Sequence, residues 1–159
     1  LVTSSKDLVK RKVEVLRGRL WRVAATSGIG AIVPVPGLSA AIDLTLITKE
    51  VRFYNSQLGL PDQNSEEFRK LTPEMVGQIS KFFVTSALQV GSLLAAYAAA
   101  STVEEYSRFI PLVGSVIAGS ISFTSTYYFL NKWLNELEET TLKYLDEINA
   151  RVTDDMGLD

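Results

Sequence analysis

The chain has 159 residues, which is long enough for one domain with a buried core. Its hydrophobic fraction of 47% is ordinary for a globular protein, and its net charge of −2 argues against non-specific binding of nucleic acid. Because the chain contains neither cysteine nor histidine, disulfides and thiolate metal sites are excluded. The commonest general base and metal ligand are missing for the same reason.

The two ends of the chain carry opposite charge. Only two acidic residues lie between Lys6 and Arg22, against seven basic ones, which are Lys6, Lys10, Arg11, Lys12, Arg17, Arg19 and Arg22. Between Glu136 and Asp159, in contrast, eight acidic residues stand against two basic ones. We therefore expect the first and last segments to be neighbours in the fold, with opposite charges along the seam between them.

The first predicted element is a helix that ends at Gly28–Gly30, with Ser4 or Ser5 as a possible cap at its start. Its apolar residues recur at alternating steps of four and three, which is the period of one helix face. They are Val9, Val13, Leu16, Leu20 and Val23. This stripe should face the core.

A second helix is expected to begin after Gly37 and to run to about Leu58, where Gly59 and Pro61 stop it. Ser65 should open a short helix that reaches about Leu71. The next helix should start at Thr72–Pro73, with threonine as the cap and proline in the first turn.

That helix could continue to about Ala100, although Gly77 or Gly91 is a plausible place for a break. A short helical piece follows at about 102–109, and then comes a long final helix. The stripe of the final helix consists of Leu130, Leu134, Leu137, Thr141, Leu145 and Ile148, flanked by Trp133 and Tyr144. Residues after Arg151 are expected to form a frayed acidic tail. The predicted fold is therefore an all-α bundle of about six or seven helices.

Two proline–glycine corners precede the second and the final predicted helices. "PVPGLSAAID" (34–43) is loosely repeated as "FIPLVGSVIAG" (109–119). Proline fixes φ and glycine admits conformations barred to other residues, so each corner can start a helix close against a neighbour. The structural corner residues are Pro34, Pro36, Gly37, Pro111 and Gly114. The repeat favours a duplicated entry into a helix, and two independently chosen turns are the alternative.

Three segments contain no charged side chain: 23–42, 82–103 and 109–131. Each reaches the roughly 20 residues that a membrane span needs. Their glycine, proline, serine and threonine content favours helices buried in a protein core, because small residues let helices approach closely. Membrane-contacting elements and true spans remain alternatives.

No motif for catalysis is found. A phosphate-binding loop needs glycines followed by lysine and a hydroxyl residue, and no glycine cluster here has them. Adjacent acidic pairs point about 100° apart on a helix and cannot share one site, so we interpret them as solvated faces. Asp43 is the most isolated acid, and we expect it to pair with Lys49 or with a basic residue of another helix.

Two blocks of sequence resemble the segments that follow the GTP-binding domain in the immunity-related, interferon-inducible GTPases. The first, "VPVPGLSAAIDLTLITKEVRFYNSQLGL" (33–60), shares a Pro-Gly corner, an alanine-rich helix with an aspartate, a Lys-Glu pair and an aromatic pair. The matching residues are Pro36, Gly37, Ala40, Ala41, Asp43, Lys49, Glu50, Phe53, Tyr54, Leu58, Gly59 and Leu60. Pro61 departs from the pattern, since the family continues directly to aspartate. The second block is "IPLVGSVIAGSISFTSTYYFLNKWLNELEE" (110–139).

This resemblance implies that the chain is the C-terminal helical domain of a larger GTP hydrolase, with residues 1–152 as the domain and 153–159 as its tail. GTP and Mg²⁺ would then be bound by the missing GTP-binding domain, and no cofactor by this chain. The resemblance also implies as partners that GTP-binding domain, N-terminal helices of the same protein, further copies of it and a membrane surface. The family acts in cell-autonomous defence at vacuoles around intracellular pathogens. A cytoplasmic location, or a peripheral one on intracellular membranes, is therefore expected.

The residues most suited to an anionic membrane are the basic ones of the first helix. They are Lys10, Arg11, Lys12, Arg17, Arg19 and Arg22. Partial neutralisation by the acidic final helix should keep this binding weak. Two other functions are open at this point: a small integral membrane protein with three uncharged helices, and a soluble helical scaffold with no lipid role.

Overall fold

A computed structural model describes the backbone of residues 2–30, 38–84, 86, 89–93 and 117–157, and side chains within 5–23, 45–84, 86, 89–93 and 127–157. The described elements are five helices: α1 (Val2–Gly30), α2 (Leu38–Leu58), α3 (Glu66–Arg69), α4 (Pro73–Ser80) and α7 (Ile117–Asp155). Residues 89–93 are also helical. The described part of the chain contains no strand, so the predicted all-α fold is confirmed.

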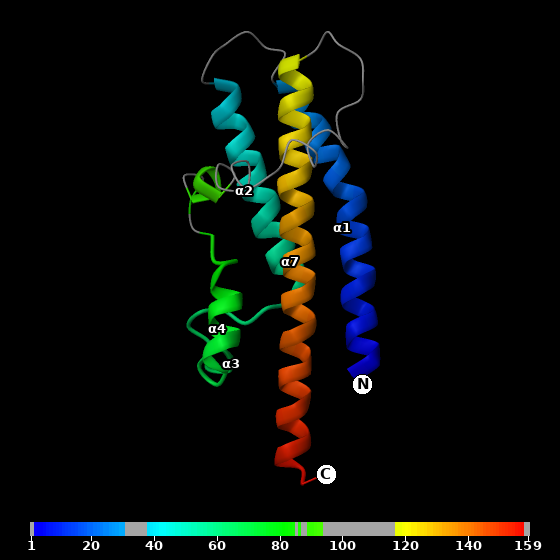
Figure 1. Cartoon of the computed structure of the whole chain (residues 1–159), viewed down its shortest axis with the longest axis vertical. Coiled ribbons are helices and arrows are strands. Elements are labelled where there is room, and N and C mark those ends of the chain that lie inside the picture. Colours follow the sequence, from blue (N-terminus) through cyan, green and yellow to red (C-terminus); the bar gives the residue numbers. More distant parts are fainter. Residues whose placement is uncertain (1, 31–37, 85, 87–88, 94–116, 158–159) are drawn as a thin grey trace.

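Three long helices form the body of the molecule. Helix α7 packs against both α1 and α2, which also contact each other. In Figure 1 α7 lies between the other two in the view, while α3 and α4 lie beside its lower half. Helix α4 contacts α7, so the short helices are attached to the same central element. The main core is therefore the space where α1, α2 and α7 meet.

The apolar stripes predicted for the first and last helices are the faces that fill this core. All five residues of the α1 stripe are buried, and so are Leu130, Leu134 and Leu137 of α7. Burial of one such side chain typically contributes about 1.5–3 kcal/mol, so the two stripes supply a large part of the driving force for folding. The predicted caps of α1 are wrong, because the helix already runs from Val2 and both Ser4 and Ser5 lie within it.

Helix α2 ends, and helices α3 and α4 begin, where their local sequence predicts. Helix α2 stops at Gly59, whose φ of 71° is a left-handed conformation that glycine adopts without strain. The hydroxyl of Ser65 accepts a hydrogen bond from the Phe68 amide and caps α3. Thr72 caps α4 by accepting from the Met75 amide at 3.3 Å.

The cap of α4 is also tied to α7. One carboxylate oxygen of Glu147 accepts from the Thr72 amide at 2.9 Å, and the other accepts from the Thr72 hydroxyl at 3.0 Å. A second apolar cluster lies beneath this contact, with Tyr144 of α7 packed against it. It consists of Phe68, Leu71, Met75 and Ile79. Polar and apolar contacts together thus hold the short helices on α7.

The helix predicted from Pro73 to about Ala100 does not exist in that form. It ends at Ser80, with Lys81 as the C-cap residue, and neither glycine considered as a breaking point lies there. Instead Phe82 packs into the main core while Phe83 packs against the second cluster. The two aromatic side chains belong to different clusters, and this accounts for a break that local propensity does not predict.

The far end of α7 extends beyond the rest of the bundle. In Figure 1 its last turns lie below the start of α1 and below the short helices. The helix continues through Asp155, past Arg151 where we expected fraying to begin. Asp154, Asp155 and Met156 are exposed.

Both Pro-Gly corners fall outside the described residues, and so do large parts of the three uncharged segments. The helices α2 and α7, which follow these corners in the sequence, have Leu38 and Ile117 as their first described residues, and the role of the corners stays a prediction. Among the helices that the structure describes, none is long and apolar enough to cross a membrane.

Candidate functional site: the two flanks of helix α1

The basic helix α1 presents three faces. Its buried stripe lies against the core, one flank faces α7 and the other faces α2. Residues one position before each member of the buried stripe form the flank toward α2, because each residue advances about 100° around the helix. We call this set the outer stripe, and it consists of Leu8, Lys12, Val15, Arg19 and Arg22.

The flank toward α7 carries the charge pairing that the sequence predicts. Lys6 forms an ion pair with Asp146 at 2.5 Å. Arg17 contacts Glu138 at 3.2 Å and donates to the side-chain oxygen of Asn135 at 2.6 Å. These pairs are solvent-exposed or half-buried, so each contributes only modestly, typically about 0.2–1 kcal/mol. Their main consequence is that basic charge on this flank is matched within the fold.

The flank toward α2 contains a tighter contact that the sequence did not predict. Arg19 donates from Nε and from an Nη to the two carboxylate oxygens of Glu50, at 2.6 and 3.1 Å. The side chain of Glu50 is only 4% exposed, whereas that of Arg19 is 50% exposed. The guanidinium also lies 4.3 Å from the ring centroid of Phe53. Two parallel hydrogen bonds and a ring contact hold the arginine in one orientation.

Tyr54 is buried one turn beyond Glu50 on α2. Its hydroxyl is inaccessible to solvent and has no hydrogen-bond partner of good geometry among the described residues. Burial raises the pKa of Tyr54, and the negative charge of Glu50 raises it further. The fold therefore holds this phenol in its neutral form.

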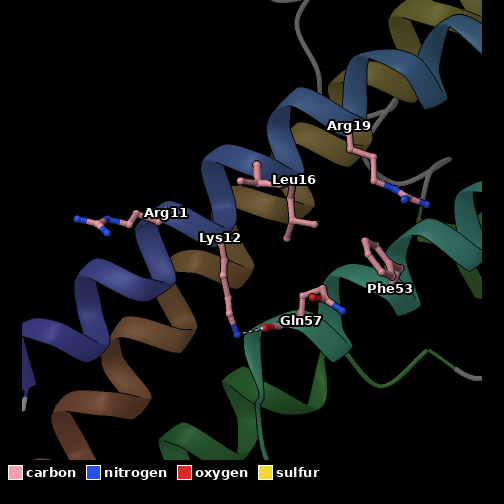
Figure 2. Close-up of a pocket in the computed structure, with 7 residues that line it drawn as sticks. Arg11, Lys12, Leu16, Arg19, Phe53 and Gln57 are labelled. Atoms are coloured by element: carbon pink, nitrogen blue, oxygen red, sulfur yellow. Dashed lines mark hydrogen bonds between the residues drawn. The ribbon is translucent and has the colours of Figure 1, made fainter.

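A surface pocket of about 350 Å³ lies between α1 and α2. Figure 2 shows Lys12 and Arg19 extending from α1 toward α2, while Arg11 extends away from it. Lys12 donates at 2.9 Å to the backbone carbonyl of Gln57, which lies in the last turn of α2. A carbonyl there has no partner within its own helix, so the lysine occupies a favourable position. The pocket is lined by Arg11, Lys12, Val15, Leu16, Arg19, Phe53 and Gln57.

The rim of this pocket combines positive charge with exposed apolar side chains. Three of its lining residues are cations and none is an acid. Val15 is 73% exposed, and Leu8 in the same outer stripe is 55% exposed. The buried stripe predicted from the sequence does not include Leu8 or Val15. Their spacing of seven, one position ahead of that stripe, is the signal that could have revealed them.

The six basic residues proposed to face a membrane do not form one surface. Arg17 is paired on the α7 flank, while Arg19 and Lys12 are engaged with α2. Lys10 and Arg11 are exposed. Arg22 is exposed as well and has an interaction of its own. Membrane contact by this set stays a prediction.

Among the described residues, no group of acidic side chains could hold a metal ion. Asp43 belongs to α2, but its side chain lies outside the described part, and its expected pairing with Lys49 stays a prediction. Charged side chains of α1 make contacts with α2 and α7 and line the pocket between α1 and α2.

Comparison with known proteins identifies distant relatives. The chain is 27% identical over 143 residues to interferon-inducible GTPase 5 of Rattus norvegicus, and equally so to that of Bos taurus. The matched region covers 85% of this chain but only 31% of each relative. No family model matches the chain, and no solved structure matches it. The chain is thus distantly similar to interferon-inducible GTPases, in an all-α region.

Proposed function

We propose that this chain is the helical, C-terminal domain of a GTPase related to the interferon-inducible GTPases. The observation that carries the proposal is the similarity to interferon-inducible GTPase 5, which extends over 85% of the chain. The all-α fold supports it, since the two blocks that resemble the family are a helix after a Pro-Gly corner and a long terminal helix. Residues 1–152 are proposed as one domain, followed by the tail 153–159.

In this proposal nucleotide chemistry belongs to another domain of the same protein. The chain offers no glycine loop with lysine and a hydroxyl residue to hold phosphates. GTP and Mg²⁺ would therefore be bound by the GTP-binding domain. The parent protein would be a GTP hydrolase in cell-autonomous defence, and this domain would connect nucleotide state to assembly and to a membrane.

The membrane part of the proposal depends on the exposed surface of α1. Trp21 is a large apolar side chain exposed on this helix, which also carries exposed cations. Amphipathic basic surfaces of this kind bind anionic lipid through apolar burial and charge attraction. Since several cations are paired within the fold, one copy would bind weakly, and assembly of many copies would strengthen attachment. The protein would then be cytoplasmic and peripheral on intracellular membranes.

The sharpest test is the coding sequence upstream of Leu1. The proposal expects a GxxxxGK[ST] phosphate loop roughly one GTP-binding domain upstream. An upstream sequence without any nucleotide-binding motif would overturn it and would leave a helical scaffold as the better function.

A second test uses the chain by itself. Isothermal titration with GTP and Mg²⁺ should give no heat of binding, whereas a longer protein with the upstream domain should bind. Micromolar binding of GTP by residues 1–159 alone would contradict the division of roles.

A further inference from the structure

Four of the five large hydrophobic side chains exposed in the described part of the chain lie in two places, and the fifth is Trp21. Val15 lines the α1–α2 pocket, and Leu8 lies two turns before it on the same flank of α1. Two others, Val152 and Met156, lie at the end of α7. We call the first place the groove, and the second, with Asp154 and Asp155, the tip. Scattered apolar residues on a surface need no explanation, but two matched clusters do.

The tip is an apolar ridge with negative charge beside it. Val152 and Met156 are one turn apart on the same face, and the Met156 amide still donates to the Val152 carbonyl at 3.1 Å. Asp154 and Asp155 are exposed between them in sequence. The C-terminal end of a helix adds a partial negative charge of its own. The tip is therefore suited to a basic, partly apolar receptor.

The groove combines positive charge with apolar surface, which complements the acidic and apolar tip. Its cations are Arg11, Lys12 and Arg19, and the buried Glu50 is the acid that Arg19 binds. Val15 and the ring of Phe53 supply apolar surface next to this charge. An apolar side chain that enters the pocket would bring neighbouring carboxylates close to the cations that line it, of which Arg11 extends outward from α1 (Figure 2).

We propose that the groove binds the tip of a second copy of this chain. A copy cannot place its own tip there, because the tip extends past the start of α1 whereas the groove lies along the middle of that helix (Figure 1). Each copy offers one groove and one tip, so the contact is head-to-tail. Such a contact joins copies into open chains unless the rotation between them closes a ring.

The contact between groove and tip is weak because it buries little surface. Two apolar side chains and a few charges bury far less than the roughly 1,200 Å² of a stable interface. Single copies should thus associate only at high concentration. Copies already held together by another part of the protein would use it readily, because linkage raises the effective concentration. The inference rests on the assembly role proposed above, but it is tested without nucleotide.

The test is analytical ultracentrifugation of the chain over a wide concentration range. The average mass should rise with concentration and continue beyond that of a dimer, and added salt should reduce the rise. A Val15→Asp variant should lose the groove, and a Val152→Asp/Met156→Asp variant should lose the tip. All three side chains are exposed, so the fold should persist, as circular dichroism melts can verify.

Mixing the two variants gives the decisive result. Each alone should stay monomeric, yet an equal mixture should form a one-to-one pair and nothing larger, since one intact groove and one intact tip remain. Arg11→Glu should weaken association several-fold, and Asp155→Lys should restore part of it. Lys10→Glu is the matched control, with the same charge change one residue away on an exposed site, and it should have little effect.

Three results would overturn the proposal. The first is a wild-type chain that stays monomeric at every concentration. The second is self-association that survives in each variant, or that the mixture fails to restore. The third is a monomeric chain whose flotation with anionic vesicles depends on Val15, which would assign the groove to a membrane. None of these results bears on the upstream phosphate loop, so failure here is distinct from failure of the proposed function.

Discussion

Arg19 of α1 donates two hydrogen bonds to the buried carboxylate of Glu50 of α2, at 2.6 and 3.1 Å. The contact joins the basic helix to the helix whose Lys-Glu pair resembles the interferon-inducible GTPases. A carboxylate with 4% of its side chain exposed is costly unless it is paired, so the arginine is needed for the glutamate to be tolerated.

Replacing Arg19 by methionine should therefore destabilise the chain by about 1–3 kcal/mol, less than for a fully buried pair because Arg19 is half-exposed. Adding Glu50→Gln to Arg19→Met should recover part of that loss, since no charge is then left buried. Urea unfolding of the two single variants and the double variant gives the coupling between the residues. Lys10→Met serves as the control. Additive effects would mean that the two side chains do not depend on each other.

The buried Tyr54 should make the free energy of unfolding depend on pH in the alkaline range. Its pKa in the fold lies above the ordinary tyrosine value of about 10. At higher pH the unfolded chain loses this proton while the folded chain keeps it. The stability associated with the neutral phenol is thus complete below about pH 10 and is lost as the pH rises above it, by up to about 1.4 kcal/mol per pH unit.

Tyr54→Phe should remove this part of the pH dependence. Because the hydroxyl has no hydrogen-bond partner of good geometry, the variant should be at least as stable as the parent near neutral pH. Denaturant unfolding at pH 8 and pH 11 measures both effects. Tyr144, whose pKa burial also raises, should leave some alkaline sensitivity in the variant. Equal losses of stability in parent and variant would contradict the assignment.

Asn55 joins three segments and provides a third prediction. Its side-chain oxygen accepts from the indole of Trp133 at 3.1 Å, and its nitrogen donates to the Phe82 carbonyl at 2.6 Å. The rings of Phe82 and Trp133 meet edge to face at 5.2 Å. Asn55→Ala should cost about 2 kcal/mol, because it leaves a part-buried donor and acceptor without their partner.

The isosteric Asn55→Asp separates the two bonds. Aspartate can still accept from Trp133, but it cannot donate to the Phe82 carbonyl. We expect it to be destabilising with a smaller change in tryptophan fluorescence than Asn55→Ala gives. A shift of equal size in both variants would indicate that the Phe82 bond, not the Trp133 bond, positions the indole.

The sequence predicts those parts of the fold that depend on local physics. Three such features follow from residues within one or two turns. They are the period of the α1 stripe, the caps Ser65 and Thr72, and the end of α2 at Gly59. The pairing of basic α1 with acidic α7 could also be predicted, because charge asymmetry along a chain does not depend on exact geometry.

Features that depend on long-range packing could not be predicted. The helix break after Ser80 arises because Phe82 and Phe83 pack in different clusters, and no local signal marks it. Burial of Glu50 depends on an arginine 31 residues away. The candidate groove exists only where α1 and α2 come together, so its residues appear in the sequence as an ordinary solvated flank.

The last prediction concerns lipid. Lys6 and Arg17 are paired with α7, and Arg19 is paired with Glu50, so much of the positive charge of α1 is neutralised locally. Exposed cations contribute about 1 kcal/mol each near an anionic surface, and less with salt. We expect one copy of the chain to float only weakly with anionic vesicles at low salt, and not with neutral ones.

Lys10→Glu/Arg11→Glu should abolish this flotation, because both residues are exposed and a double reversal makes the surface repel anionic lipid. Val15→Asp should leave the flotation almost unchanged if the groove is reserved for a second copy. Trp21→Ala tests the apolar part of the lipid contact, because an exposed indole inserts readily at a lipid interface. Loss of this indole should weaken vesicle binding several-fold. Tight flotation that resists salt would mean that the membrane-active surface lies elsewhere in the chain than on α1.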